Sequence, residues 1–168
     1  RKAIGRGEFA LKEQNGTLPR ISEGPLSGYY TQFAGQAYLS LQNAEVGELN
    51  IYGKKQGVSV VAWIKWTGAQ TGFVGGMWNE YQDGGKRQYG LYVALPQYNG
   101  KNQVCGHISQ SGKQTPPLPY SIDYAASRQE VPVNQWVSIS FTYDGNYIRS
   151  YLNGVLEKRA PELINHTK

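Results

Sequence analysis

The clearest alternation of hydrophobic and polar positions lies between residues 58 and 66, where the sequence reads VSVVAWIKW. Residues two apart share one face of a strand. One face would therefore carry Val58, Val60, Ala62, Ile64 and Trp66. The other would carry Ser59, Val61, Trp63 and Lys65. Because both faces hold large apolar side chains, the pattern predicts a central strand of a sheet.

A second alternating segment begins at Trp136 and contains two turn signals. Apolar positions from Val137 to Tyr143 alternate with serine and threonine, as in a strand with one buried face. Asp144-Gly145 and then Asn153-Gly154 follow, and both dipeptides favour tight hairpin turns because Asp, Asn and Gly tolerate positive φ. Residues 136–158 are thus predicted to form three strands, each paired with the next.

Other segments extend the same pattern. Tyr89–Leu95 alternates, and Gln103–Gln110 can pair back onto it after the Asn99-Gly100 turn. Residues 29–41 predict two short strands around Gly35, with three candidates for burial: Tyr38, Leu39 and Leu41. Residues 42–50 are compatible with a single short turn, and no longer run has the pattern and caps of a helix. Many short strands without helices predict an all-β fold, an antiparallel two-sheet sandwich or a barrel.

Length and composition support one folded domain. A chain of 168 residues with 39% hydrophobic and 17% charged residues is long and apolar enough to bury a core. No apolar stretch approaches the roughly 20 residues of a spanning helix. The net charge of +5 comes from scattered basic pairs rather than a basic run, so no nucleic-acid partner is predicted.

Two segments rich in Gly or Pro, residues 75–87 and 111–130, are predicted to be loops. The first holds the candidate ligand-binding residues: Trp78, Asn79, Tyr81, Gln82 and Asp83, with Arg87 at its end. Sugar recognition needs an aromatic face for the C–H side of the ring and amides or carboxylates for the hydroxyls. Trp78 would then be a sugar platform; packing beneath the loop as a plug is the alternative, and both stay open.

The order of five motifs resembles the concanavalin A-like lectin/glucanase superfamily, in its laminin G-like jelly-roll branch. These motifs are FAGQAYLSL, VSVVAWIKW, GGMWNE, YGLYVAL and VNQWVSISFTYDGNYIRSYLNGVLEKR. The last is the most specific, with Gln135-Trp136 opening a strand and the turns Tyr143-Asp144-Gly145 and Asn153-Gly154 after it. The resemblance covers about residues 20 to 158. It implies two facing antiparallel sheets and a non-catalytic binding role, often toward carbohydrate, in secreted or surface proteins.

The sequence departs from this family pattern in three places. Phe33-Ala34-Gly35 lacks the acidic residue often found there, and Gln36-Ala37 follows instead of a small polar or acidic pair. Both changes weaken the case for calcium, which the family allows as a cofactor, and leave the metal status open. Family domains also continue through further strands after the Asn-Gly turn. The single domain over residues 1–168 is therefore expected to be incomplete at its C-terminus.

No catalytic residues are predicted. The hydrolytic branch of the superfamily carries Glu-x-Asp-x-x-Glu, which places its carboxylates in one cleft, and the sequence has no such motif. A Gly-x-Ser-x-Gly elbow is also absent. The lone Cys105 would share a strand face with His107 and is expected to be a small buried residue facing inward.

These observations predict a non-catalytic, lectin-like carbohydrate-binding module of a secreted, cell-surface or periplasmic protein, with a glycan or polysaccharide as partner. A structural or adhesion module that binds a protein partner or a neighbouring domain is the alternative. A third hypothesis is a glycoside hydrolase-associated domain whose catalytic residues lie outside this chain.

Overall fold

A computed structural model describes residues 7, 9–51, 56–68, 71–79, 86–95, 101–109, 111–113 and 124–157. The chain divides into two compact units, residues 1–50 and 51–168. Within the described ranges, no helix has the length and apolar character needed to cross a membrane. That the whole chain is one domain stays a prediction.

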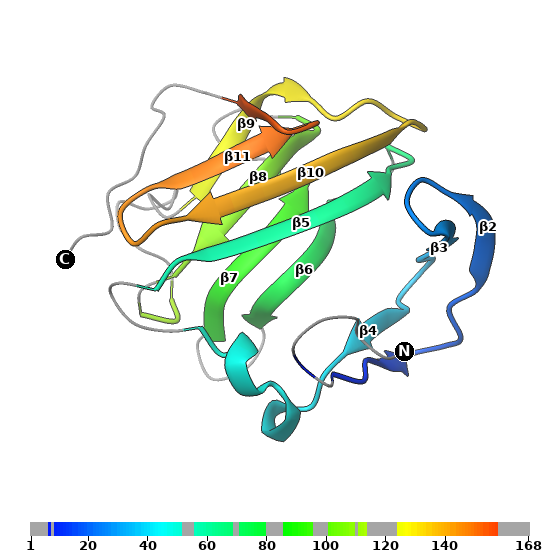
Figure 1. Ribbon diagram of the computed structural model, residues 1–168, viewed down its shortest axis with the longest axis horizontal. Helices are drawn as coiled ribbons and strands as arrows, with labels where there is room; N and C mark the ends of the chain where they lie inside the picture. The colour runs from blue at the N-terminus through cyan, green and yellow to red at the C-terminus, as the bar shows by residue number, and fades with distance from the viewer. Residues whose placement is uncertain are drawn as a thin grey trace. The chain divides into compact units, whose positions relative to one another are not determined.

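The first unit is built from short antiparallel pairs (Figure 1). β1 (Lys12–Gln14) pairs with β4 (Tyr38–Ser40), and β2 (Arg20–Gly24) pairs with β3 (Gly28–Thr31). Two 3-10 turns follow, η1 (Asn43–Glu45) and η2 (Gly47–Leu49). The two strands predicted around Gly35 are confirmed as β3 and β4. Burial of Tyr38 is wrong, because a two-stranded ladder leaves its side chain exposed.

The second unit is a sandwich of two four-stranded antiparallel sheets (Figure 1). One sheet has the order β12-β11-β10-β5, formed by Val155–Glu157, Ile148–Leu152, Trp136–Tyr143 and Val58–Lys65. The other has the order β6-β7-β8-β9, formed by Gly72–Asn79, Lys86–Val93, Gln103–Ile108 and Tyr124–Glu130. The predicted all-β, two-sheet antiparallel fold is confirmed, as are the hairpins β7–β8 and β10–β11–β12.

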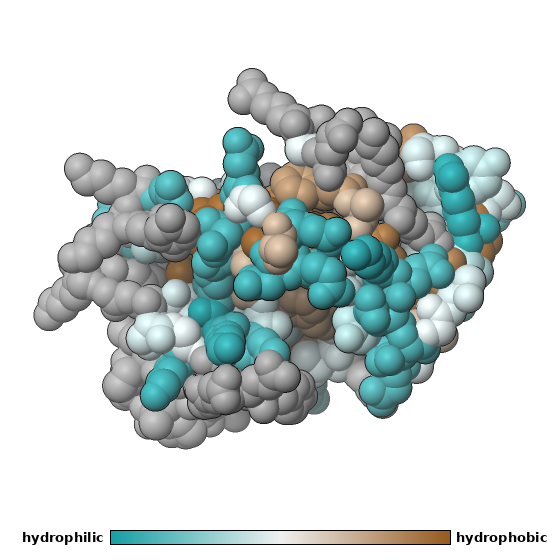
Figure 2. Space-filling model, turned by 90° about the horizontal axis from the view of Figure 1, so that it is seen from below, coloured by the Kyte–Doolittle hydropathy of each residue, from teal (hydrophilic) through white to brown (hydrophobic). Residues whose placement is uncertain are grey.

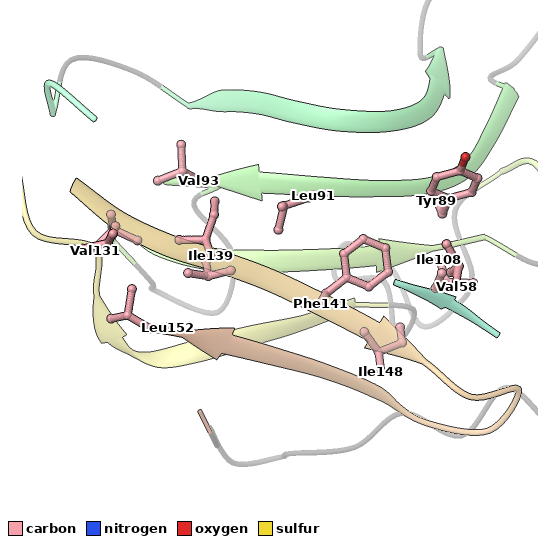
Figure 3. Packing of buried hydrophobic residues seen from close by; sticks show 12 residues of the cluster. Val58, Tyr89, Leu91, Val93, Ile108, Val131, Ile139, Phe141, Ile148 and Leu152 are labelled. Atoms are coloured by element: carbon pink, nitrogen blue, oxygen red, sulfur yellow. The ribbon is translucent and has the colours of Figure 1, made fainter. Parts of the chain in front are cut away.

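The core fills the space between these two sheets, as Figure 3 shows. Alternate residues of β10 face inward: Val137, Ile139 and Phe141 are all buried. They pack with apolar side chains from β7, β8 and β11, among them Leu91, Val93, Val104, Ile108, Ile148 and Leu152. The strict alternation along β10 is the reason that its sequence pattern predicted this strand correctly.

Gly106 of β8 allows the two sheets to approach at the centre of the core. A Cβ atom at this position would lie 2.4 Å from Cβ and 2.6 Å from Cγ of Phe141 on the facing sheet. Real Cβ atoms do not come so close, so the ring of Phe141 occupies the space that a larger residue would need.

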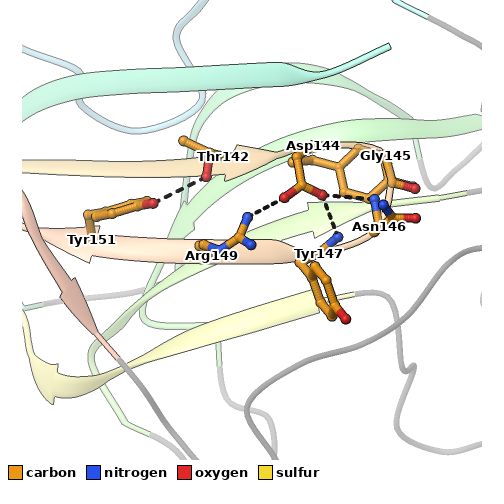
Figure 4. A network of polar contacts seen from close by, with 8 residues as sticks. Thr142, Asp144, Gly145, Asn146, Tyr147, Arg149 and Tyr151 are labelled. Atoms are coloured by element: carbon orange, nitrogen blue, oxygen red, sulfur yellow. Dashed lines mark hydrogen bonds and ion pairs between the residues drawn. The ribbon is translucent and has the colours of Figure 1, made fainter. Parts of the chain in front are cut away.

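The β10–β11 turn is held by the Asp144 side chain (Figure 4). Its Oδ1 accepts hydrogen bonds from the backbone N–H groups of Asn146 and Tyr147, both at 2.9 Å. Its Oδ2 accepts a hydrogen bond from the Arg149 guanidinium. Chiefly through the Arg149 bond, with help from the backbone donors, the pKa of Asp144 falls from 3.8 to about 2. The predicted role of Asp144 in turn formation is therefore confirmed.

Two predictions about strand placement are wrong. β5 lies at the end of its sheet order among the described strands, not at the centre. Its second face, with Val61 and Trp63, is exposed. Apolar side chains on both faces thus did not signal burial of both faces, because an apolar residue can remain at the surface.

The predicted loops at residues 75–87 and 111–130 contain strand ends. Gly75–Asn79 belongs to β6, Lys86–Arg87 to β7 and Tyr124–Glu130 to β9. The glycines of residues 75–76 suggested a loop, but in β6 they allow close pairing with β7 near a shift of register. A Cβ on Gly76 would lie 2.2 Å from the carbonyl oxygen of Tyr89.

Replacing Gly106 is expected to destabilise the second unit. In Gly106→Ala the new methyl group must displace Phe141, at a cost of about 1–3 kcal/mol in the free energy of unfolding. Chemical denaturation measures this change. Gly75→Ala is the matched control, because its Cβ would make an ordinary 3.9 Å contact with Val60, and it should stay within about 0.5 kcal/mol of wild type. Equal stability of Gly106→Ala and wild type would contradict the packing described.

Protonation of Asp144 is expected to weaken the fold at acid pH. Its folded-state pKa lies below the unfolded value of about 4, so its contribution to stability is present above pH 4 and is lost as the pH falls toward 2. The carboxylate is 45% exposed, so the effect is screened and should be below about 1 kcal/mol. Asp144→Asn keeps acceptors for the turn and removes the charge. Denaturation at pH 7, 4 and 2 should show a flatter pH dependence in the variant, and identical pH profiles would disprove the assignment.

Candidate functional site

An aromatic cluster lies on the face of the β6-β7-β8-β9 sheet that points away from the core. Leu91 and Val93 of β7 face the core, so Tyr92 between them faces outward. The same alternation sends Cys105 and His107 of β8 outward, away from Val104 and Ile108. We use "aromatic cluster" for five residues: Phe73, Trp78, Tyr92, His107 and Tyr124.

The rings of the aromatic cluster contact one another across all four strands. Trp78 meets His107 edge to face with ring centroids 5.0 Å apart, and meets Tyr92 in the same manner at 5.7 Å. His107 stacks on Tyr124 at 5.3 Å with 17° between the planes. Phe73 contacts Tyr92 at 5.2 Å. Aromatic contacts of this kind add about 0.5–1.5 kcal/mol each beyond area burial, so the cluster is a rigid unit.

Exposure within the aromatic cluster increases toward β6. His107, Tyr92 and Tyr124 are buried. Trp78 is half-buried, and Phe73 is 51% exposed. A ligand approaching the cluster therefore meets Phe73 and Trp78 first, with the buried rings fixing their positions from behind.

Arg87 and Asn79 lie next to Trp78. Arg87 is the partner of Trp78 in the β6–β7 register, and its guanidinium carbon lies 5.3 Å from the centroid of the Trp78 ring. Asn79 follows Trp78 at the end of β6, opposite Lys86. The structure thus brings together three predicted site residues: Trp78, Asn79 and Arg87. The other three, Tyr81, Gln82 and Asp83, lie outside the described residues.

Trp78 combines parts of both predicted roles. It packs into the aromatic cluster on one side, as a plug would, and remains partly accessible to solvent. Its position in strand β6 rather than in a loop corrects the prediction, and this position holds the ring more firmly than a loop would.

Sequence reasoning missed Phe73, His107 and Tyr124 as parts of the site. Cys105 and His107 share a strand face and Cys105 is buried, as predicted. The prediction that this face points inward is wrong, because it lies on the side of the sheet away from the core, where His107 is buried as well. The sequence signal for His107 lies in the segment QVCGHIS, where Cys105 and His107 alternate with the core residues Val104 and Ile108. Alternation along one strand does not distinguish burial between the two sheets from burial on the outer face of one sheet.

On the face that Figure 2 shows, hydrophobic residues come to the surface in patches between hydrophilic ones. Among the residues that the structure describes, no three His, Cys, Asp or Glu side chains come together as a metal-binding group. The chemistry that the described site offers is therefore aromatic contact together with hydrogen bonds from Arg87 and Asn79.

Comparison with known proteins agrees with this fold. A solved structure similar to the chain is domain 4 of AbnA, a GH43 extracellular arabinanase from Geobacillus stearothermophilus, in complex with arabinotriose. The TM-score is 0.51 at 17% sequence identity, and the match covers 91% of this chain and 60% of that chain, so it shows a shared fold. No curated protein matches the chain.

The sequence itself matches a family model, the concanavalin A-like lectin/glucanases superfamily, over residues 33–167. This range includes the aromatic cluster and the sandwich core described above. This match confirms the resemblance drawn from the sequence motifs. The chain belongs to the concanavalin A-like lectin/glucanase superfamily.

Proposed function

We propose that this chain is a non-catalytic, lectin-like carbohydrate-binding module, and that Trp78, Asn79 and Arg87 form part of its ligand surface. The observation that carries the proposal is the aromatic cluster, in which an accessible Phe73 and a half-buried Trp78 are held by buried rings. Tyr81, Gln82 and Asp83, which lie outside the described residues, remain predicted members of this surface.

A neutral sugar fits the chemistry of this surface. The C–H side of a sugar ring packs against an aromatic face, which Phe73 and Trp78 offer. The guanidinium of Arg87 and the amide of Asn79 supply donors and an acceptor for the sugar hydroxyls. Since the cluster already fixes the rings, binding costs less side-chain entropy.

The similar structure supports this ligand class, because that domain was obtained in complex with arabinotriose. The shared superfamily supports it as well. The proposed role also predicts a location outside the cytoplasm, whether secreted, on the cell surface or periplasmic, because a polysaccharide ligand would be found there.

Two of the described carboxylates, Asp144 and Glu157, have roles in the fold. Asp144 holds the β10–β11 turn. Glu157 of β12 is buried and accepts a hydrogen bond at 3.1 Å from the backbone N–H of Gln129 in β9. A glycosidase needs two carboxylates that flank the glycosidic bond. Asp144 and Glu157 instead accept hydrogen bonds from the backbone of this chain.

Removing the Trp78 side chain is expected to weaken glycan binding at least about ten-fold, because the sugar loses its main aromatic contact. Isothermal titration with arabinotriose and a panel of neutral oligosaccharides measures the affinity. Since Trp78 also packs in the cluster, Arg87→Ala and Phe73→Ala provide variants with less effect on folding, and each should weaken binding.

Phe33→Ala is the control for this series, because Phe33 is an exposed aromatic residue of the first unit. It should bind as wild type does. Folded variants of Trp78, Arg87 and Phe73 that all keep wild-type affinity would refute the proposed surface. A protein that binds no glycan and instead captures a protein partner would replace the proposal with the adhesion role.

A further inference from the structure

The outer face of the second sheet, β12-β11-β10-β5, carries a strip of small hydroxyl side chains. The core-facing residues of β10 alternate with Ser138, Ser140 and Thr142, which point to the opposite side. We call these three residues the hydroxyl strip. All three are partly exposed.

Larger side chains flank the hydroxyl strip on both neighbouring strands. In the β5 register, Trp63 lies opposite Ser138 and Val61 lies opposite Ser140. On β11, Tyr151 lies opposite Ser140. Adjacent strands are about 4.8 Å apart, so the flanking strands β5 and β11 are separated by about 10 Å with only small side chains between them.

The polar and aromatic groups of this face are available to a ligand. In the described part of the chain, no hydrogen bond engages the hydroxyl of Ser138 or Ser140. The Thr142 hydroxyl lies 3.4 Å from the hydroxyl of Tyr151, and Figure 4 shows the two side chains facing each other. Trp63 is 42% exposed.

The charge distribution favours a neutral ligand. None of the six residues of the strip and its flanks is charged, and Lys65, the next outward residue of β5, lies beyond Trp63 at the Ser138 end. At one end of the strip, Arg149 lies opposite Thr142 and is held by Asp144. Protein-binding surfaces are depleted in serine at their centres, whereas hydroxyl groups beside an aromatic ring suit the hydroxyls and C–H face of a sugar.

We propose that the hydroxyl strip with Trp63 is a second glycan-binding site, which takes a segment of an extended neutral polysaccharide lying along β10. Ser138 and Thr142 are about 13 Å apart along the strand, a length that suits a chain of sugars better than a single ring. The inference rests on the proposed function only in taking a glycan as the ligand, and its residues are separate from the Trp78 surface.

Two sites on the outer faces of the two sheets have a consequence for affinity. A long polysaccharide that reaches both sites, on one molecule or on neighbouring ones, is held by avidity. A trisaccharide gains no such advantage. The chain should therefore bind a polymer more tightly than arabinotriose.

Affinity electrophoresis in gels that contain linear arabinan, xylan or mixed-linkage β-glucan tests the second site. Trp63→Ala removes the aromatic group, and Ser140→Arg places a large charged side chain on the strip. Each should weaken polymer retention about ten-fold, while Trp63→Phe keeps most of it. Val133→Ala is the matched control, because Val133 is also 42% exposed and lies between β9 and β10, and it should behave as wild type.

The outcomes separate this inference from the proposed function. Loss of retention in the Trp63 and Ser140 variants with Trp78→Ala unaffected supports the second site and counts against the first. Loss in Trp78→Ala with both strip variants at wild-type retention overturns the second site alone. If sedimentation shows a dimer that Trp63→Ala dissociates without loss of retention, the face serves self-association and the inference is overturned.

Discussion

The contact between Phe141 and Gly106 at the centre of the sandwich is the constraint on which the other features depend. It sets the close approach of the two sheets and so fixes which residues of β8 and β10 face inward. Because side chains alternate along a strand, the outward residues are then fixed as well. A shift of one residue in β8 would bury Cys105 and His107 between the sheets and break the aromatic cluster. A shift in β10 would bury the hydroxyl strip.

The two outer faces have different physical characters. Outside the β6-β7-β8-β9 sheet, a second layer of buried rings supports a half-buried Trp78 and an exposed Phe73. Outside the β12-β11-β10-β5 sheet, small hydroxyls lie between an exposed Trp63 and Tyr151. The first face offers a rigid aromatic surface and the second an extended polar one, so one sandwich presents two kinds of surface suited to sugars.

Much of the fold could be predicted from the sequence, and the reasons are local. The alternation of β10 and the turn dipeptides Asp144-Gly145 and Asn153-Gly154 specify the last three strands. Positive φ occurs in this region only at three turn residues, Gly145, Asn153 and Gly154. The edge position of β5 could not be predicted, since its exposed Val61 and Trp63 have the same hydrophobicity as buried residues. Glycines in β6 indicated a loop but serve strand pairing.

The candidate site was predicted in part. Trp78, Asn79 and Arg87 were identified from residue type and do lie together. The rings that position them, His107 and Tyr124, come from strands far away in the sequence. Their contact depends on strand order in the sheet, which residue spacing along one strand does not reveal.

The most direct test of the account is an NMR titration that follows the indole N–H signals of the four tryptophans while arabinotriose is added. The account predicts that the Trp78 signal shifts in a saturable manner, while that of Trp66, which packs against the core, stays in place. A Trp78 signal that does not move at saturating arabinotriose or any other neutral oligosaccharide, in a folded sample, would contradict it.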